Sequence, residues 1–262
     1  MEIFRFDNQR EIFIGDDEQV AVVFATARFI HLAKKAIQEH KTFSVALSGG
    51  TTPKKFYEYL ALPENSSRVD WSSVHIFWSD ERAVAPDHPE SNYGMAMKIW
   101  SQSPIAKAHF YRMQGEAADL EKAACDYEAQ IKKHCFEGRF DLMLLGIGQD
   151  GHTASLFPYS KALEVHDKLI VSTVTSDNKN NRLSVTFPCI HESRQVMVFA
   201  FGKNKTAVFR ELLYGEEDYR KYPAQCLGQK AGSGPVLFVV DKETASFLIP
   251  HNTNNKIEKE YQ

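Results

Sequence analysis

The stretch Phe140-Asp141-Leu142-Met143-Leu144-Leu145 is apolar at every position but its one aspartate. Apolar residues at consecutive positions, without alternation, are typical of a strand that is covered on both faces, as in a parallel sheet. A glycine-rich segment follows it at once, from Gly146 to Pro158. The sequence therefore predicts a buried strand that opens directly into a loop.

On both sides of this strand, apolar runs of strand length alternate with segments of helical period. The predicted strands are 11–15, 43–47, 74–78, 140–145, 169–175, 183–187, 196–201 and 236–240. The predicted helices are a long one after the cap pair Asp16-Asp17, one opened by Pro53, and 91–100, 117–135 and 205–213. This alternation predicts an α/β fold, with a mostly parallel sheet and helices on both faces.

The length and composition are those of an ordinary globular protein. The chain has 262 residues, of which 43% are apolar and 25% are charged. It contains no long linker rich in Pro, Gly or Ser and no internal repeat. We therefore expect residues 1–262 to form a single catalytic domain, with a polar and frayed tail from about residue 251.

The charge balance and the cysteines exclude several classes of protein. Lysine and arginine number 31 against 34 acidic residues, a net charge of -3. A nucleic-acid binder normally has a basic excess, so none is expected here. No apolar run is long enough to span a bilayer, and the N-terminus lacks a signal peptide, which predicts a cytoplasmic protein. The four scattered cysteines form no C-x-x-C pair and are expected to be reduced thiols.

The loop after the strand 140–145 carries the strongest chemical signal. Its glycines Gly146, Gly148 and Gly151 let the backbone pass close to a substrate. Asp150 and His152 flank the last of them and are expected to project into one cleft. Histidine exchanges protons near neutral pH, and a neighbouring carboxylate fixes its tautomer. This pattern predicts an acid/base pair, and it is too short to indicate a metal site.

The loop Ser48-Gly49-Gly50-Thr51-Thr52-Pro53 lies between a predicted strand and a predicted helix. Its glycines permit close approach to a ligand, and the free N–H groups of a helix N-terminus bind anions. The spacing is neither G-x-G-x-x-G nor Walker A, so neither a dinucleotide nor a nucleoside triphosphate is indicated. Taken alone, the loop is as consistent with a tight turn as with a binding site.

Charged side chains mark three further places at strand ends or starts. They are Asp80-Glu81-Arg82, Arg182, and Lys205 in the segment Gly202-Lys203-Asn204-Lys205. An arginine and a lysine that converge on one point form a phosphate site. Solvated surface charge is the alternative, and the spacing alone favours it. Because ligands of open parallel sheets bind outside the carboxyl ends of the strands, we expect these loops to lie together.

Taken in order, these segments resemble the 6-phosphogluconolactonase family, in the superfamily shared with glucosamine-6-phosphate deaminase. The resemblance spans nearly the whole chain. The matching segments are Leu47 to Pro53, Trp78 to Arg82 with Ser91-Asn92, Gly146 to Pro158, Arg182 to Thr186, and Gly202 with Lys205. Deaminases usually continue differently after Asp-Gly-His and carry Asp-Glu-Tyr in place of Asp80-Glu81-Arg82. Both differences favour the lactonase and a modified Rossmann-like sheet.

The resemblance implies hydrolysis of 6-phosphoglucono-δ-lactone to 6-phosphogluconate in the oxidative pentose phosphate pathway, with no metal or organic cofactor. It implies a catalytic role for His152, with Asp150 as its companion. The residues implied to bind the substrate are Gly49, Gly50, Thr51, Arg182 and Lys205 at the phosphate and Asp80 and Arg82 beside the lactone. Departures from the family pattern are Asn181, Thr206 and the segment 188–191, none of which removes a polar group that the reaction needs.

The expected mechanism is direct attack by water, without a covalent intermediate. His152 takes a proton from water and returns it to the ring oxygen, while Arg82 or loop N–H groups stabilise the charge on the carbonyl oxygen. Ser155 is close to His152 in the chain, but no G-x-S-x-G elbow supports a serine nucleophile.

Two alternatives stay open, an amino-sugar-phosphate deaminase and, less favoured, a non-catalytic sugar-phosphate sensor. The sequence does not indicate the oligomeric state or the specificity among phosphorylated lactones. Nor does it indicate whether Asp150 orients His152 or contacts the sugar.

Overall fold

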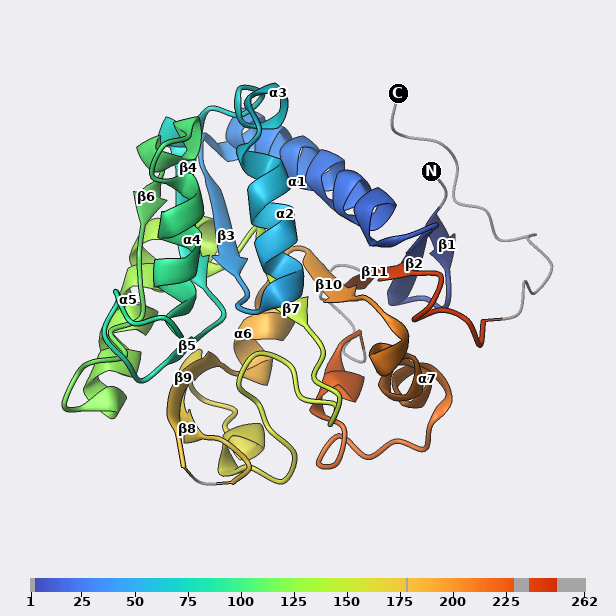
Figure 1. Cartoon of the computed structure of the whole chain (residues 1–262). Coiled ribbons are helices and arrows are strands. Elements are labelled where there is room, and N and C mark those ends of the chain that lie inside the picture. Colours follow the sequence, from blue (N-terminus) through green and yellow to red (C-terminus); the bar gives the residue numbers. More distant parts are fainter. Residues whose placement is uncertain (1–2, 178, 229–235, 249–262) are drawn as a thin grey trace.

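A central sheet organises the chain (Figure 1). The computed structural model describes residues 3–177, 179–228 and 236–248. The strand order is β1-β2-β11-β10-β7-β3-β4-β6, and only the pair β1 and β2 is antiparallel. The strands are β1 (Ile3–Arg5), β2 (Arg10–Gly15), β3 (Phe43–Leu47), β4 (Val74–Trp78), β6 (His109–Phe110), β7 (Leu142–Gly146), β10 (Val196–Ala200) and β11 (Val236–Asp241). The predicted polar tail from residue 251 lies outside the described residues.

Helices cover both faces of this sheet, so the predicted fold class is confirmed. The cluster on one face includes α1 (Glu18–His40), α2 (Thr51–Ala61) and α4 (Asn92–Trp100). The other includes α5 (Leu120–His134), α6 (Phe187–Glu192) and α7 (Thr206–Tyr214). In β7, Leu142 and Leu144 belong to the first cluster, and Met143 and Leu145 to the second. This division explains why the strand is apolar without alternation.

Capping residues set the start of the main helices. Asp17 accepts a hydrogen bond from the Val20 N–H and begins α1, as its sequence predicts. Ser91 does the same for α4 through the Gly94 N–H. The helix α2 begins at Thr51, two residues before the predicted start at Pro53, and a short helix, α3 (Pro63–Ser66), follows it.

Two of the predicted strands do not join the main sheet. They are β8 (Ile170–Val174) and β9 (Asn181–Val185). With β5 (Asp80–Arg82) they form a separate antiparallel sheet of order β5-β9-β8, in which β9 pairs with both of the others. The segment between β8 and β9 is too short for the crossover that parallel neighbours need, so the two strands form a hairpin. The sequence predicts that Phe187 ends a strand. In the structure Phe187 begins α6 instead, and Thr186 caps this helix.

A stack of histidines at the edge of the main sheet makes stability depend on pH. The His75 ring lies 4.9 Å from that of His109 and 5.8 Å from that of His134. Burial, reinforced by the charges of these two histidines, lowers the pKa of His75 from 6.5 to about 4. Between these values the unfolded chain binds more protons than the folded one, so the free energy of unfolding falls as the pH drops from 6.5 to about 4.

We therefore expect His75→Asn to flatten the pH dependence of the free energy of unfolding in this window. Urea denaturation at a series of pH values measures it. His166→Asn is the matched control, because His166 is exposed and outside the stack. An unchanged slope in His75→Asn would contradict the assignment.

Candidate active site

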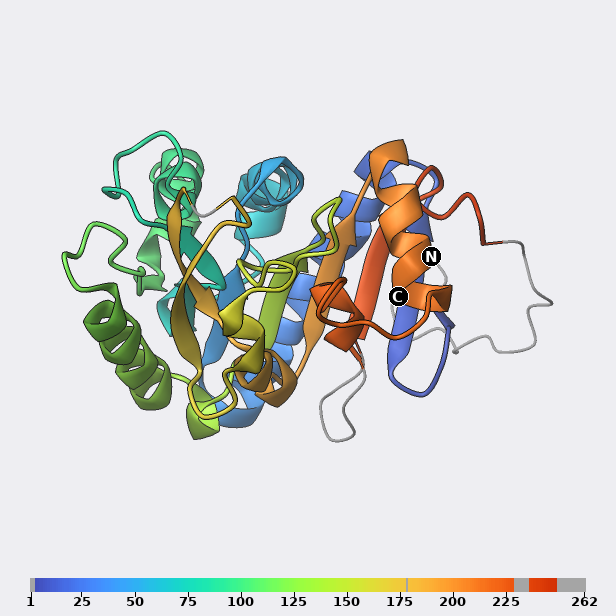
Figure 2. The same ribbon diagram turned by 90° about the horizontal axis from the view of Figure 1, so that it is seen from below.

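The loops singled out by the sequence lie at one edge of the main sheet. The strands β10, β7, β3 and β4 are parallel neighbours, and each is followed by one of these loops. Their carboxyl ends point downward in Figure 1, and Figure 2 looks onto this edge from below. The expectation that the loops lie together therefore agrees with the topology.

The loop after β7 is a tight turn built on glycines. The Gly148 N–H donates to the His152 carbonyl at 2.8 Å, and the Gly151 N–H donates to the Gly148 carbonyl at 3.1 Å. Gly151 has φ +86°, which side-chain-bearing residues rarely adopt. A Cβ on Gly148 would lie 2.1 Å from His152 Nδ1. The imidazole therefore packs directly on the Gly148 backbone.

Asp150 and His152 are in contact. Asp150 Oδ1 lies 2.6 Å from His152 Nδ1 and also accepts a hydrogen bond from the His152 N–H at 3.2 Å. Burial would raise the pKa of Asp150, but the hydrogen bonds and charge of His152 outweigh burial and lower it. An ionised carboxylate at Nδ1 favours the tautomer with the proton on that nitrogen. Nε2 then carries a lone pair, and it has no hydrogen-bond partner among the described residues.

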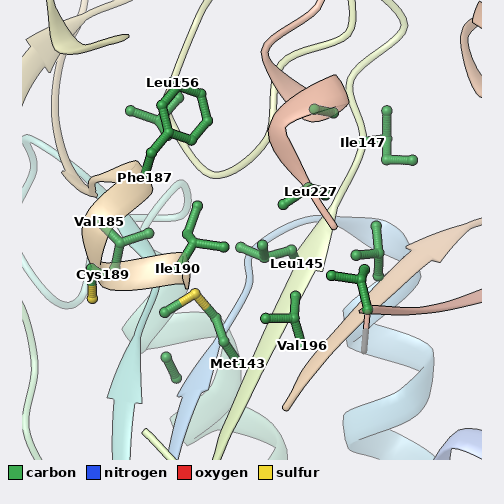
Figure 3. Close-up of a cluster of buried hydrophobic side chains, with 14 of the residues drawn as sticks. Met143, Leu145, Ile147, Leu156, Val185, Phe187, Cys189, Ile190, Val196 and Leu227 are labelled. Atoms are coloured by element: carbon green, nitrogen blue, oxygen red, sulfur yellow. The ribbon is translucent and has the colours of Figure 1, made fainter. Parts of the chain in front are cut away.

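The residues after His152 anchor the loop in the protein. Thr153 Oγ1 donates to the Gly146 carbonyl at 3.0 Å, and Ser155 Oγ donates to Asp80 Oδ2 at 2.7 Å. Between them Ala154 has φ +50°, in the left-handed region. Leu156 lies beside Phe187 in the hydrophobic cluster drawn in Figure 3. These contacts hold the chain on the carboxyl side of His152.

Ser155 is not placed as a nucleophile. Its side chain is 1% exposed, and its hydroxyl donates to Asp80 and not to His152. The Ser155 N–H donates to Ser184 Oγ at 3.1 Å, which ties the loop to β9 as well.

Lys205 approaches the same loop from the end of β10. Its ammonium donates to the Ile147 carbonyl at 2.7 Å. Burial lowers the pKa of Lys205, and the negative charge of Asp150 partly offsets this shift. The lysine therefore carries its charge beside the Asp150–His152 pair.

The arginines Arg82 and Arg182 lie opposite each other on β5 and β9. Each donates to a backbone carbonyl, Arg82 to Glu90 at 2.6 Å and Arg182 to Asn181 at 3.0 Å. Burial, and next the charge of Arg82, lower the pKa of Arg182. Two neighbouring guanidinium groups form a site that attracts a phosphate or carboxylate.

The acidic residues between β4 and these arginines are turned inward. Asp80 is 8% exposed and Glu81 is 2% exposed. Glu81 accepts hydrogen bonds from the N–H groups of Asn92 and Tyr93 and from Ser91 Oγ, and so fixes the start of α4. Burial raises the pKa of Glu81. The sequence pattern shows that acidic residues are present here, but not that their side chains point inward. That direction depends on the pairing of β5 with β9.

The glycine loop presents backbone to solvent at the start of α2. Gly50 has φ +104° and, like Thr51, is exposed. Ser48, the first residue of the loop, is held in place, because Tyr57 Oη donates to the Ser48 carbonyl at 2.6 Å. The free N–H groups at the start of α2 are those that an anion would bind. Lys205 and Arg182 each donate to a backbone carbonyl, and their convergence on one phosphate stays a prediction.

In the part of the chain that the structure describes, no group of three or more His, Cys, Asp or Glu side chains is arranged to hold a metal ion. None of the helices described is both long enough and apolar enough to cross a bilayer.

Comparison with known proteins identifies the family. The sequence profile of the family described as "Glucosamine-6-phosphate isomerases/6-phosphogluconolactonase" matches residues 16–236. The chain belongs to this family. A 6-phosphogluconolactonase of Synechocystis sp. is 39% identical over 237 residues, which cover 88% of this chain and 93% of that protein. The prediction of an enzyme from the 6-phosphogluconolactonase family is confirmed.

Solved structures show the same fold. The crystal structure of a 6-phosphogluconolactonase from Shewanella baltica OS155 matches with a TM-score of 0.80 and 24% identity, covering 89% of this chain and 98% of that one. A monomeric glucosamine-6-phosphate deaminase matches with a TM-score of 0.77 and 20% identity, covering 90% and 98%. Since both activities occur on this fold, the fold alone does not separate lactonase from deaminase within the family.

Proposed function

We propose that this protein hydrolyses 6-phosphoglucono-δ-lactone to 6-phosphogluconate in the cytoplasm, as a step of the oxidative pentose phosphate pathway. The observation that carries the proposal is the Asp150–His152 pair, whose Nδ1 to Oδ1 distance is 2.6 Å, at the carboxyl edge of the sheet. The names of the relatives that match most of the chain support the same substrate.

The catalytic step requires a base that takes a proton from water. His152 Nε2 accepts this proton while the hydroxide adds to the lactone carbonyl, and Asp150 stabilises the imidazolium that forms. The pKa of Asp150 is lowered, so its carboxylate stays ionised at neutral pH. The imidazolium then returns the proton to the ring oxygen as the tetrahedral intermediate collapses. The ring opens to the free acid, and no covalent intermediate forms.

Positively charged side chains around the Asp150–His152 pair bind the two ends of the substrate, the lactone carbonyl and the phosphate. Arg82 or loop N–H groups stabilise the negative charge on the carbonyl oxygen. Arg182, Lys205 and the loop Gly49-Gly50-Thr51 hold the phosphate, which orients the ring for attack. The carbonyl of a lactone is already electrophilic, so this route uses only groups of the chain and water.

Lys205→Ala is expected to raise KM by about 10- to 100-fold with a smaller change in kcat, because a charge-assisted hydrogen bond to phosphate is lost. Steady-state kinetics with the phosphorylated lactone measures both constants. Lys203→Ala is the matched control, since Lys203 is an exposed lysine in the same turn. A KM equal to that of the wild type would refute the role of Lys205.

The deaminase is the alternative that the fold permits. Two assays on the same preparation separate the reactions: acid release from 6-phosphoglucono-δ-lactone, and ammonia release from glucosamine 6-phosphate. We expect turnover of the lactone above its spontaneous hydrolysis and no ammonia. Ammonia release without lactone turnover would overturn the proposed function.

A further inference from the structure

The carboxylate of Asp80 lies between two loops of the active site. Its Oδ2 accepts the hydrogen bond from Ser155 Oγ at 2.7 Å, and its Oδ1 lies 3.3 Å from Asn92 Nδ2. Asn92 Nδ2 also donates to the Asp80 carbonyl at 2.9 Å. With the side chain buried, both carboxylate oxygens are bound to groups of the protein itself.

The first partner belongs to the loop of His152. Ser155 is three residues after His152, and the residue next to it, Ala154, has φ +50°. A residue with a side chain keeps this conformation only where its neighbours hold it. The hydrogen bonds of Ser155 to Asp80 and Ser184 are among the contacts that do so, with that of Thr153 to the Gly146 carbonyl. Loss of the Asp80 contact would therefore loosen the segment that carries the imidazole.

The second partner supports the glycine loop. A Cβ on Gly49 would lie 1.9 Å from Asn92 Oδ1, so the Gly49 backbone packs directly on the Asn92 amide. Asp80 thus accepts hydrogen bonds from the same amide group on which the Gly49 backbone packs. The position of the glycine loop depends on Asn92, and the position of the Asn92 side chain depends on Asp80.

We propose that Asp80 is a positioning residue. Through Ser155 it fixes the position of the His152 loop, and through Asn92 it fixes the position of the glycine loop. This inference rests on the proposed function. In it the partners of Asp80 are groups of the protein, whereas the family resemblance implies a contact between Asp80 and the substrate. The charge of Asp80 has a second effect, since it raises the pKa of Arg182 and so offsets part of the repulsion from Arg82.

Single substitutions separate the two contacts of Asp80, one to Ser155 and one to Asn92. Ser155→Ala removes the hydroxyl that holds the His152 loop, and we expect kcat to fall about 10- to 100-fold with little change in KM. Asn92→Ala removes the side chain on which Gly49 packs. For this variant we expect KM and the inhibition constant of inorganic phosphate to rise several-fold, with a smaller change in kcat. Ser160→Ala is the matched control, because the buried Ser160 hydroxyl has no hydrogen-bond partner among the described residues.

A double-mutant cycle tests the contact directly. Asp80→Asn and Ser155→Ala disturb the same hydrogen bond, so their effects on kcat are expected to be less than additive. If Asp80→Asn lowers activity while Ser155→Ala and Asn92→Ala keep wild-type kcat, KM and phosphate inhibition, Asp80 contacts the substrate and the proposal is overturned. Should Asp80→Asn not fold, as judged by circular dichroism, the two other variants still decide.

A readout without substrate distinguishes failure of this inference from failure of the proposed function. The ¹⁵N signals of the His152 imidazole report its hydrogen bond to Asp150. We expect these signals to shift in Ser155→Ala and to stay unchanged in Ser160→Ala. Unchanged signals in both variants would contradict the positioning role, whereas a wild-type protein that does not hydrolyse the lactone contradicts only the proposed function.

Discussion

His152→Ala is expected to lower kcat/KM for the lactone by about 10²- to 10⁴-fold, the usual contribution of one general acid/base group. The substitution removes the nitrogen that accepts the proton from water, and no other imidazole is placed on the loop between β7 and Pro158. The fold is expected to persist, because the His152 side chain is 32% exposed and the loop is held by Thr153 and Ser155.

The measurement is a stopped assay of acid release, corrected for spontaneous hydrolysis of the lactone. Circular dichroism on the same samples shows whether the variant is folded. His88→Ala serves as the control, because His88 is an exposed histidine at a distance from the loop in sequence. Near-normal turnover in His152→Ala would mean that another group is the base.

The second large effect is expected from Gly148→Ala, which adds one methyl group. That Cβ would lie 2.1 Å from His152 Nδ1 and 2.4 Å from Asp150 Oδ1, so both side chains must move. A displacement of about 1 Å in a reacting group costs on the order of 10²-fold in rate, and we expect kcat to fall by that amount.

Gly146→Ala is a closely matched control for this substitution. It makes the same chemical change two residues earlier, where a Cβ would meet no atom within 4 Å. We expect Gly146→Ala to retain most of the wild-type kcat. Equal activity of the two variants would show that the contact between Gly148 and the imidazole has no part in catalysis.

The sequence predicts best those features that depend on local pattern. The buried strand β7, the caps of α1 and α4, and the contact between Asp150 and His152 all follow from residues close together in the chain. The gathering of the loops at one edge follows from a general property of parallel sheets.

Features that depend on long-range pairing could not be predicted in the same way. The sequence predicts a loop at residues 80–82, where the structure has β5. So short a segment becomes a strand only when β9 pairs with it. That pairing also turns Asp80 inward and brings Ser155 to it. Residue types alone indicated a polar contact here, but they did not say whether the partner is a substrate or the protein.

The antiparallel register that places Arg82 opposite Arg182 also has an energetic consequence. Like charges directly opposite each other on neighbouring strands are destabilising. This repulsion lowers the stability of the small sheet, and we expect an anion bound between the guanidinium groups to restore it. If an anionic ligand binds there, as the proposed function requires, ligand binding and folding are coupled at this point, and the ligand stabilises the folded protein as well as reacting in it.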